Sequence, residues 1–376
     1  MALRFCSVFS EMTREPLEDE NLEWSDGSDP HVLPEAVRLA FSALDRPLEI
    51  RPLSGGLLHR SFHVRASDSE YVLQRVSDVF APEIHDNIQV VTEHLSARGF
   101  VTATLLPTVD GHLSAMLGPL GRWRLMPHLG GASFRRLQSV AQAHSAGELV
   151  GRFHAAMQDF DRPLAPMGIP YRDSPFYLAA MRGALEAHRD HRLAVEIAPL
   201  GERVLAAFEE LGPPLEVESR VIHGDLKLEN LLFESRTGPG SERAFALIDL
   251  DTLMRGPLWM ELGDAWRSWC NSSGEDTREA RFEMSFFEAS ARGFFEGYDV
   301  SLSDLERRSL VTATERMTLE LCARYVTDTL EECYFGWDDS SFAGLGEHNA
   351  VRAAGQWRFY EAACECRDER ARILGL

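Results

Sequence analysis

Hydrophobic positions follow two different patterns along the chain. Between residues 31 and 128, apolar residues fall mostly in short runs separated by Gly, Ser and Asp, as is typical of antiparallel strands. Helical spacing appears before residue 45 and again in a longer segment that ends at Gly99. This part therefore predicts a small antiparallel sheet with one long helix. The strand segments are LEIRPLSGG, RSFHVRA, YVLQRV, GHLSAML and GRWRLMPHL.

Beyond Gly130, long segments with helical spacing dominate the pattern. One stretch departs from it, because VIHGDLKLENLLFES and AFALIDLDT are strand-like and are joined by RTGPGSER, whose Gly, Pro and Ser suit a turn. We therefore predict an α+β fold with two lobes. A small antiparallel sheet lobe with one helix spans residues 31–128, and a larger, mostly helical lobe spans residues 129–376 and carries the β-hairpin.

Charge and composition exclude several classes of function. With 38 Lys and Arg against 59 Asp and Glu, the formal net charge of −21 repels polyanions, so a nucleic-acid partner is not expected. Residues 1–30 are acidic and Ser-rich and predict a solvated, disordered tail. There is no apolar segment long enough for a secretory signal or a membrane span. Six irregularly spaced cysteines do not suggest a disulfide framework, and a reduced cytoplasm fits best.

The stretch VIHGDLKLEN carries the strongest chemical signal. Asp225 is placed to accept a proton from a hydroxyl group, and Lys227 could reach a transferring phosphoryl group. Asn230 and Asp249, the latter in the returning segment LIDLD, offer the oxygen ligands that Mg²⁺ prefers. His223 is expected to brace the loop. These residue types at this spacing predict phosphoryl transfer with ATP and Mg²⁺.

A surface turn after a strand is the structural alternative, because Asp and Asn favour turns through local hydrogen bonds. The second strand ending in Ile-Asp weakens that alternative. Asp251 is left open, since it could assist the metal or be a solvent-facing carboxylate at a strand end.

These motifs carry a family resemblance. HxDxxxxN followed by an Ile-Asp strand resembles the protein-kinase-like superfamily, in its aminoglycoside phosphotransferase and choline kinase branch. Within that branch, blocks spread over roughly residues 45 to 365 are similar to those of N-acetylhexosamine 1-kinases. The resemblance implies a bilobal kinase-like fold and phosphorylation of the 1-hydroxyl of a sugar. The oligomeric state is left open, and a monomer is assumed. The blocks are YVLQRVSDVF, GIPYRDSP, HGDLKLENLLF, ALIDLDTLM, ELGDAWRS and RYVTDTLEECYF.

Two segments are expected to contact the nucleotide through backbone groups. Gly55 and Gly56 lie at the tip of LSGGLLHRSF, where a kinase-like fold covers the phosphates with a Gly-rich hairpin, although two glycines alone indicate only a turn. RWRLMPHL is expected to link the lobes, with the backbone around Met126 to His128 meeting the adenine. The alternative for Met126 is an ordinary core residue.

Side chains on the nucleotide side are less regular. Arg75 stands where kinases carry a phosphate-binding Lys, and Arg keeps the cation although the two are not interchangeable. Glu93 on the following helix is the expected partner of that cation, whereas Glu83 lies near the helix start. Both carboxylates could equally be surface charges.

On the acceptor side, the resemblance implies that Arg324 and Tyr334 contribute to a sugar pocket together with Asp225. A salt bridge is the alternative for Arg324. Two departures from the family pattern are Glu261, where relatives generally carry Asp, and Glu332-Cys333, which replaces a Gly-Asp pair. Asp264 and Arg267, one helical turn apart, predict a structural ion pair that supports the catalytic loop.

Three rival functions stay open. A protein kinase is disfavoured because Gly224 replaces an Arg, Leu250-Asp251 replaces Phe-Gly, and no Ala-Pro-Glu follows. An aminoglycoside or amino-alcohol (choline-like) phosphotransferase shares all catalytic parts. A catalytically inactive nucleotide-binding scaffold has only Arg75 in its favour.

Overall fold

The computed structural model describes residues 33–53 and 58–376. Its amino-terminal part is a five-stranded antiparallel sheet with strand order β1-β2-β3-β5-β4. In β2, Phe62, Val64 and Ala66 are buried on one face while Arg65 is exposed, so the period-2 pattern sets which face packs. The elements of this part are α2 (Glu35–Ala40), β1 (Leu48–Leu53), β2 (Arg60–Ala66), β3 (Ser69–Val76), α3 (Ile84–Ser96), β4 (Ala115–Met116) and β5 (Arg122–Pro127).

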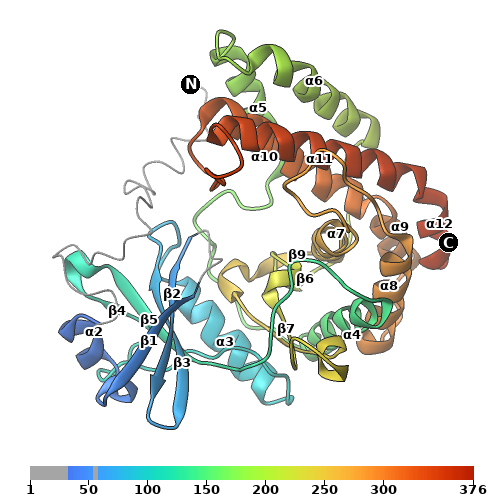
Figure 1. Cartoon of the computed structure of the whole chain (residues 1–376). Coiled ribbons are helices and arrows are strands. Elements are labelled where there is room, and N and C mark those ends of the chain that lie inside the picture. Colours follow the sequence, from blue (N-terminus) through green and yellow to red (C-terminus); the bar gives the residue numbers. More distant parts are fainter. Residues whose placement is uncertain (1–32, 54–57) are drawn as a thin grey trace.

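The carboxyl-terminal part is larger and mostly helical, and the sheet lies to one side of it (Figure 1). Two short antiparallel strand pairs, β7 with β8 and β6 with β9, lie within it. Its helices are α4 (Val140–Ala156), α5 (Ser174–Ala187), α6 (Ala194–Leu211), α7 (Leu258–Trp269), α8 (Met284–Tyr298), α9 (Asp304–Val311), α10 (Ala313–Glu331), α11 (Leu345–Glu365) and α12 (Arg367–Ile373). Its strands are β6 (Ser219–Ile222), β7 (Leu231–Phe233), β8 (Ala244–Leu247) and β9 (Met254–Pro257).

The predicted α+β class is confirmed, with two differences in detail. The hairpin β7-β8 forms as expected, but Val221 and Ile222 belong to the separate pair β6-β9, because β6 pairs with a strand that follows Asp249 in the chain. The amino-terminal part contains the short helix α2 in addition to α3. The tail 1–30 and the glycines 55 and 56 lie outside the described residues.

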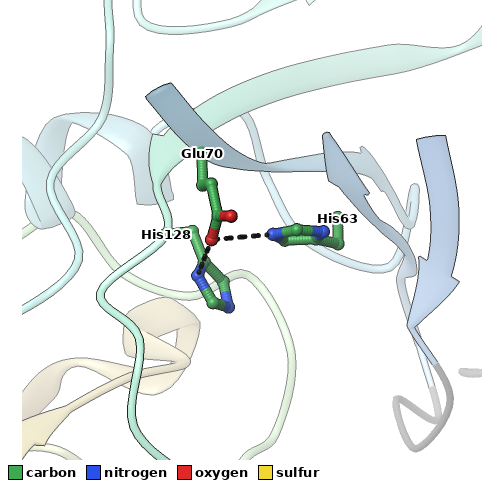
Figure 2. Close-up of side chains that lie close together, drawn as sticks. All are labelled: His63, Glu70 and His128. Atoms are coloured by element: carbon green, nitrogen blue, oxygen red, sulfur yellow. Dashed lines mark hydrogen bonds and ion pairs between the residues drawn. The ribbon is translucent and has the colours of Figure 1, made fainter. Parts of the chain in front are cut away.

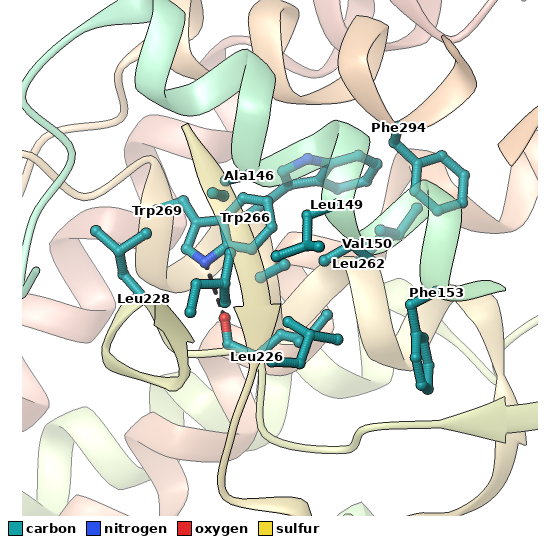
Figure 3. Close-up of a cluster of buried hydrophobic side chains, with 14 of the residues drawn as sticks. Ala146, Leu149, Val150, Phe153, Leu226, Leu228, Leu262, Trp266, Trp269 and Phe294 are labelled. Carbon is teal, nitrogen blue, oxygen red and sulfur yellow. Dashed lines mark hydrogen bonds between the residues drawn. The ribbon is translucent and has the colours of Figure 1, made fainter. Parts of the chain in front are cut away.

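A continuous apolar core supports the segment that carries Asp225. It runs from α3 through α4 to α7 and α8 and includes Leu226 and Leu228, which alternate with the polar residues of that segment. The indole nitrogen of Trp269 donates a hydrogen bond to the carbonyl oxygen of Leu226 at 2.9 Å, so the core also holds the backbone (Figure 3). A loop anchored in this way keeps its polar side chains in one geometry.

Two further observations concern the character of the helices and the state of the cysteines. Among the described residues, no helix combines the length and the apolar character that crossing a membrane requires. Cys270, Cys322, Cys364 and Cys366 are free thiols, whereas Cys333 is disulfide-bonded.

Candidate active site

Asp225, Lys227 and Asn230 converge in the segment between β6 and β7. The Lys227 Nζ donates to the Asp225 Oδ2 at 2.7 Å. The Asn230 Nδ2 donates to the backbone oxygen of Asp225 at 2.8 Å and to its Oδ2 at 3.0 Å. With its amide nitrogen used in this way, Asn230 keeps its side-chain oxygen for a cation. The tight segment, which includes a 3₁₀ turn over Leu228–Asn230, makes these bonds possible over five residues.

Asp249 joins this group from the end of β8. Its Oδ2 lies 3.9 Å from the Lys227 Nζ, and 39% of its side chain is exposed. Its backbone is left-handed, with φ 63° and ψ 60°, a conformation that a non-glycine residue keeps only when its surroundings hold it. The four residues that the sequence singled out for chemistry therefore lie together.

Opposite charges set the ionisation of this group. Desolvation alone would raise the pKa of Asp225, but Lys227 and Arg172 hold that pKa well below its usual range. Desolvation would lower the pKa of Lys227, yet Asp225 and Asp249 raise it. Desolvation raises the pKa of Asp249, Lys227 counteracts this, and the carboxylates of Asp251 and Asp225 raise it further. Asp225 is thus an ionised carboxylate beside an ammonium group.

The donor set fits a divalent cation. Asn230 and Asp249 offer hard oxygen ligands, and the crowding of carboxylates that raises the pKa of Asp249 is the kind of repulsion that a bound cation offsets. Mg²⁺ suits such a site, because it usually takes few protein ligands and fills its other positions with phosphate oxygens and water.

Backbone geometry ahead of Asp225 is held by Glu261, the residue that departs from the family pattern. Its two carboxylate oxygens accept from the backbone N–H groups of His223 and Gly224 at 2.8 and 2.9 Å. Gly224 has φ 81°, and a Cβ there would lie 2.6 Å from the Thr252 carbonyl oxygen, so no larger residue fits. The His223 ring is buried with its Nε2 2.9 Å from the Ile248 carbonyl oxygen, which agrees with the expected bracing role.

Arg172 is a site residue that the sequence reasoning did not single out. Its Nε donates to the Gly224 carbonyl oxygen at 2.9 Å, and its guanidinium lies 2.7 Å from Asp264 and 3.9 Å from Asp225. Its φ of 55° is left-handed. In the sequence, the only indication of a role for Arg172 was its position as a charged residue in the block GIPYRDSP. The predicted pair of Asp264 and Arg267 forms at 3.1 Å, and Arg172 connects it to the catalytic segment.

Asp251 is not the solvent-facing carboxylate at a strand end that the sequence allowed. It is 3% exposed and is held by both terminal nitrogens of Arg124 on β5, at 2.5 and 2.6 Å. The His59 Nδ1 accepts from the backbone of Ser77, so its Nε2 carries the proton that faces Asp251 at 3.0 Å. This buried cluster ties the sheet to the segment that follows Asp249.

The expected pairing of Arg75 with Glu93 is wrong. Glu93 lies on the surface of α3, where it accepts from Gln89 at 2.8 Å and pairs with Arg162 at 3.3 Å. Gln74 points to the face of the sheet toward Asp251, where its side-chain oxygen accepts a hydrogen bond from Arg124 at 2.8 Å. Arg75, the next residue in the strand, points to the opposite face. The Arg75 Nε instead lies beside Gly121, 3.0 Å from where a Cβ would lie. The cation on the face of the sheet toward Asp251 is therefore Arg124 and not Arg75.

The segment predicted to meet the adenine is the end of β5. Met126 pairs with Val72 in the sheet and packs against the main core. The backbone N–H of His128 donates to the Glu70 carbonyl oxygen at 2.9 Å, so that group is occupied within the protein. A contact between a base and this segment stays a prediction, as does any contact from Gly55 or Gly56.

Two of the residues predicted for the acceptor, Arg324 and Tyr334, contact each other. The guanidinium of Arg324 donates to the Tyr334 hydroxyl at 3.3 Å and lies 5.0 Å from the ring centre of Tyr177. One turn earlier on α10, Glu320 lies 3.8 Å from Arg172. The helix that carries Arg324 is thus connected to Asp225 through Glu320 and the buried cation of Arg172.

Comparison with known proteins agrees with this geometry. Residues 49–298 match the model of the family described as APH, phosphotransferase enzyme family. The structure of a microcompartment-associated aminopropanol kinase has a TM-score of 0.57 at 18% identity, over 87% of this chain and 95% of that one. Amicoumacin kinase, solved with AMP-PNP, Ca²⁺ and Ami, has a TM-score of 0.55 at 12% identity, over 85% and 88%. An aminoglycoside phosphotransferase from Alicyclobacillus acidocaldarius has a TM-score of 0.52 at 18% identity, over 92% of this chain and 100% of that one.

The fold and the converging Asp, Lys and Asn side chains define a kinase-like phosphotransferase. More specifically, the chain belongs to the APH phosphotransferase enzyme family, whose members transfer phosphate from ATP to a hydroxyl group of an acceptor. The solved structures share less than 25% identity with this chain and support its fold alone.

Proposed function

We propose that the protein transfers the γ-phosphoryl group of ATP to the anomeric hydroxyl of a small sugar, an N-acetylhexosamine or a related compound. The convergence of Asp225, Lys227, Asn230 and Asp249 is the observation that carries the phosphoryl-transfer part. The sugar part rests on the sequence blocks described above and on the chemistry around Arg324.

Each residue has a distinct role in this proposal. The ionised Asp225 orients the acceptor hydroxyl and accepts its proton, and Lys227 beside it offsets charge on the transferring group. Asn230 and Asp249 would hold Mg²⁺, which when bound neutralises charge on the phosphate oxygens. Glu261 and Arg172 position the backbone ahead of Asp225.

The side chains near Arg324 suit a neutral, hydroxyl-rich acceptor. A sugar needs directional hydrogen-bond donors and an aromatic face, and Arg324 with Tyr177 and Tyr334 offers both. The buried guanidinium of Arg324 would repel an ammonium group placed beside it. We therefore favour a sugar over a cationic acceptor.

One observation favours a second candidate, an amino alcohol or aminoglycoside. Glu320 is 1% exposed, and among the described residues its Oε1 has no hydrogen-bond partner. Desolvation raises its pKa, and a nearby ammonium group would stabilise its ionised form. Glu320 could therefore bind a cationic acceptor in place of a sugar.

A coupled ADP-release assay over a panel of acceptors decides between the two. We expect N-acetylhexosamines and related free sugars to give turnover that depends on Mg²⁺, and their 1-O-methyl glycosides to give none because the reacting hydroxyl is blocked. Turnover with amino alcohols or aminoglycosides but not with sugars would support the second candidate. ATP binding without turnover on any acceptor would indicate a nucleotide-binding module.

Replacing Arg324 tests the acceptor side. We expect Arg324→Ala to raise the KM for the acceptor by roughly tenfold or more, since a hydrogen bond to a charged group contributes about 1.5–3 kcal/mol. The KM for ATP should change little. The measurement is initial rate against each substrate in turn.

Arg203, on α6 and stacked over Trp357 at 4.7 Å, offers a matched Arg-to-Ala control away from the site. An acceptor KM that is unchanged in Arg324→Ala, with Arg203→Ala also unchanged, would remove Arg324 from the acceptor site.

A further inference from the structure

Two histidines and a glutamate gather in the sheet part, away from Asp225. The His63 Nε2 lies 3.3 Å from the Glu70 Oε2, and the His128 Nδ1 lies 3.4 Å from the same oxygen (Figure 2). All three ligand atoms lie within 4.8 Å of one another. We propose that His63, Glu70 and His128 form a binding site for Zn²⁺ or a similar first-row transition metal.

The distances suit metal ligands better than strong hydrogen bonds. Charge-assisted hydrogen bonds between nitrogen and a carboxylate are about 2.7–2.9 Å long, so both His-to-Glu distances are long for such bonds. In tetrahedral coordination with Zn–N and Zn–O bonds of about 2.0–2.1 Å, neighbouring ligand atoms lie roughly 3.3 Å apart. The Glu70 oxygen lies at that spacing from both imidazole nitrogens.

The sheet holds the three side chains in place. Glu70 on β3 lies beside β2, which carries His63, and its backbone carbonyl accepts from the His128 N–H at 2.9 Å. Arg65 donates to the other carboxylate oxygen, Oε1, through Nε at 3.1 Å and a terminal nitrogen at 2.9 Å. That pairing leaves Oε2 facing the histidines and orients it, as partners of metal-binding carboxylates commonly do.

The ligand types select the metal. Two imidazoles and one carboxylate suit Zn²⁺, Ni²⁺ or Cu²⁺, whereas Mg²⁺ prefers oxygen ligands. The side chains of His63, Glu70 and His128 are 18, 38 and 30% exposed, so water can complete the coordination.

A zinc titration of the full chain tests the site, with millimolar Mg²⁺ present to occupy all-oxygen sites. By calorimetry we expect one Zn²⁺ bound to the wild type, with affinity at least about tenfold weaker in His63→Ala and in His128→Ala. Co²⁺ in place of Zn²⁺ should give visible absorption bands typical of nitrogen ligation, lost in both variants. Circular dichroism and thermal melting without metal check that the variants fold.

His144→Ala is the matched control. That histidine also faces a carboxylate, with its Nε2 2.9 Å from the Glu296 Oε2, but it is in neither of the groups of three potential metal ligands found among the described residues. It should bind zinc like the wild type. The second such group is His59, Asp249 and Asp251, and zinc bound there would be unaffected by His63→Ala. Unchanged zinc binding in both His63→Ala and His128→Ala, or no binding by the wild type, would overturn the proposal.

Discussion

Asp225→Asn should reduce kcat by at least about a hundredfold, and by up to ten-thousandfold, while nucleotide binding changes little. A general base contributes rate factors of this size, and an amide cannot accept the proton of the acceptor hydroxyl. The substitution keeps the shape of the side chain. It also removes the carboxylate that pairs with Lys227 at 2.7 Å, but Asp249 lies 3.9 Å from the same ammonium group. ADP release and calorimetric binding of a non-hydrolysable ATP analogue measure the two effects separately.

Glu229→Gln is the matched control for that substitution. Glu229 lies in the 3₁₀ turn that follows Asp225, and the replacement again turns a carboxylate into an amide. We expect activity within a few-fold of the wild type. Similar activity in Asp225→Asn and Glu229→Gln would exclude Asp225 as the base.

Arg124→Met should destabilise the protein by about 3–5 kcal/mol, because it leaves the buried carboxylate of Asp251 without its main partner. Desolvation would raise the pKa of Asp251, and Arg124 holds that pKa well below its usual range, followed by a smaller effect of His59. Chemical denaturation measures the free energy of unfolding. Activity should fall as well, since Asp251 lies two residues from Asp249.

Two comparisons make the result interpretable. Adding Asp251→Asn to Arg124→Met removes the unpaired charge, so the double variant should recover part of the lost stability. Glu93→Gln breaks an exposed pair with Arg162 and should cost about 0–1 kcal/mol. If the free energy of unfolding of Arg124→Met fell by less than about 1 kcal/mol, the buried pair would not stabilise the connection between the sheet and the segment that follows Asp249.

The chemistry of the loop was predictable because it is local. Asp225, Lys227 and Asn230 lie within six residues, and Asp249 follows at the end of the hairpin strand β8, so their spacing almost determines their proximity. The alternation of Leu226 and Leu228 with polar residues also predicts which side chains face the core.

The cation and the carboxylate expected near the nucleotide could not be predicted in the same way. A strand pattern places Arg75 and Gln74 on opposite faces but does not say which face lies toward the site. The motif suggested Arg75, whereas the structure places Arg124 there, bonded to a residue 127 positions away. For the same reason Glu93, although well placed along α3, points to the surface and pairs with Arg162.

The sequence by itself determined the class of fold, the segment that carries the carboxylates and the amide, and the spacing that lets them meet. Only the tertiary structure decided which cation faces Asp251, that Arg172 joins α10 to the catalytic segment, and that His63, Glu70 and His128 converge. The physical reason is the range of the interactions. Residues a few positions apart are constrained by backbone geometry, while residues far apart in the chain meet only through the packing of whole elements.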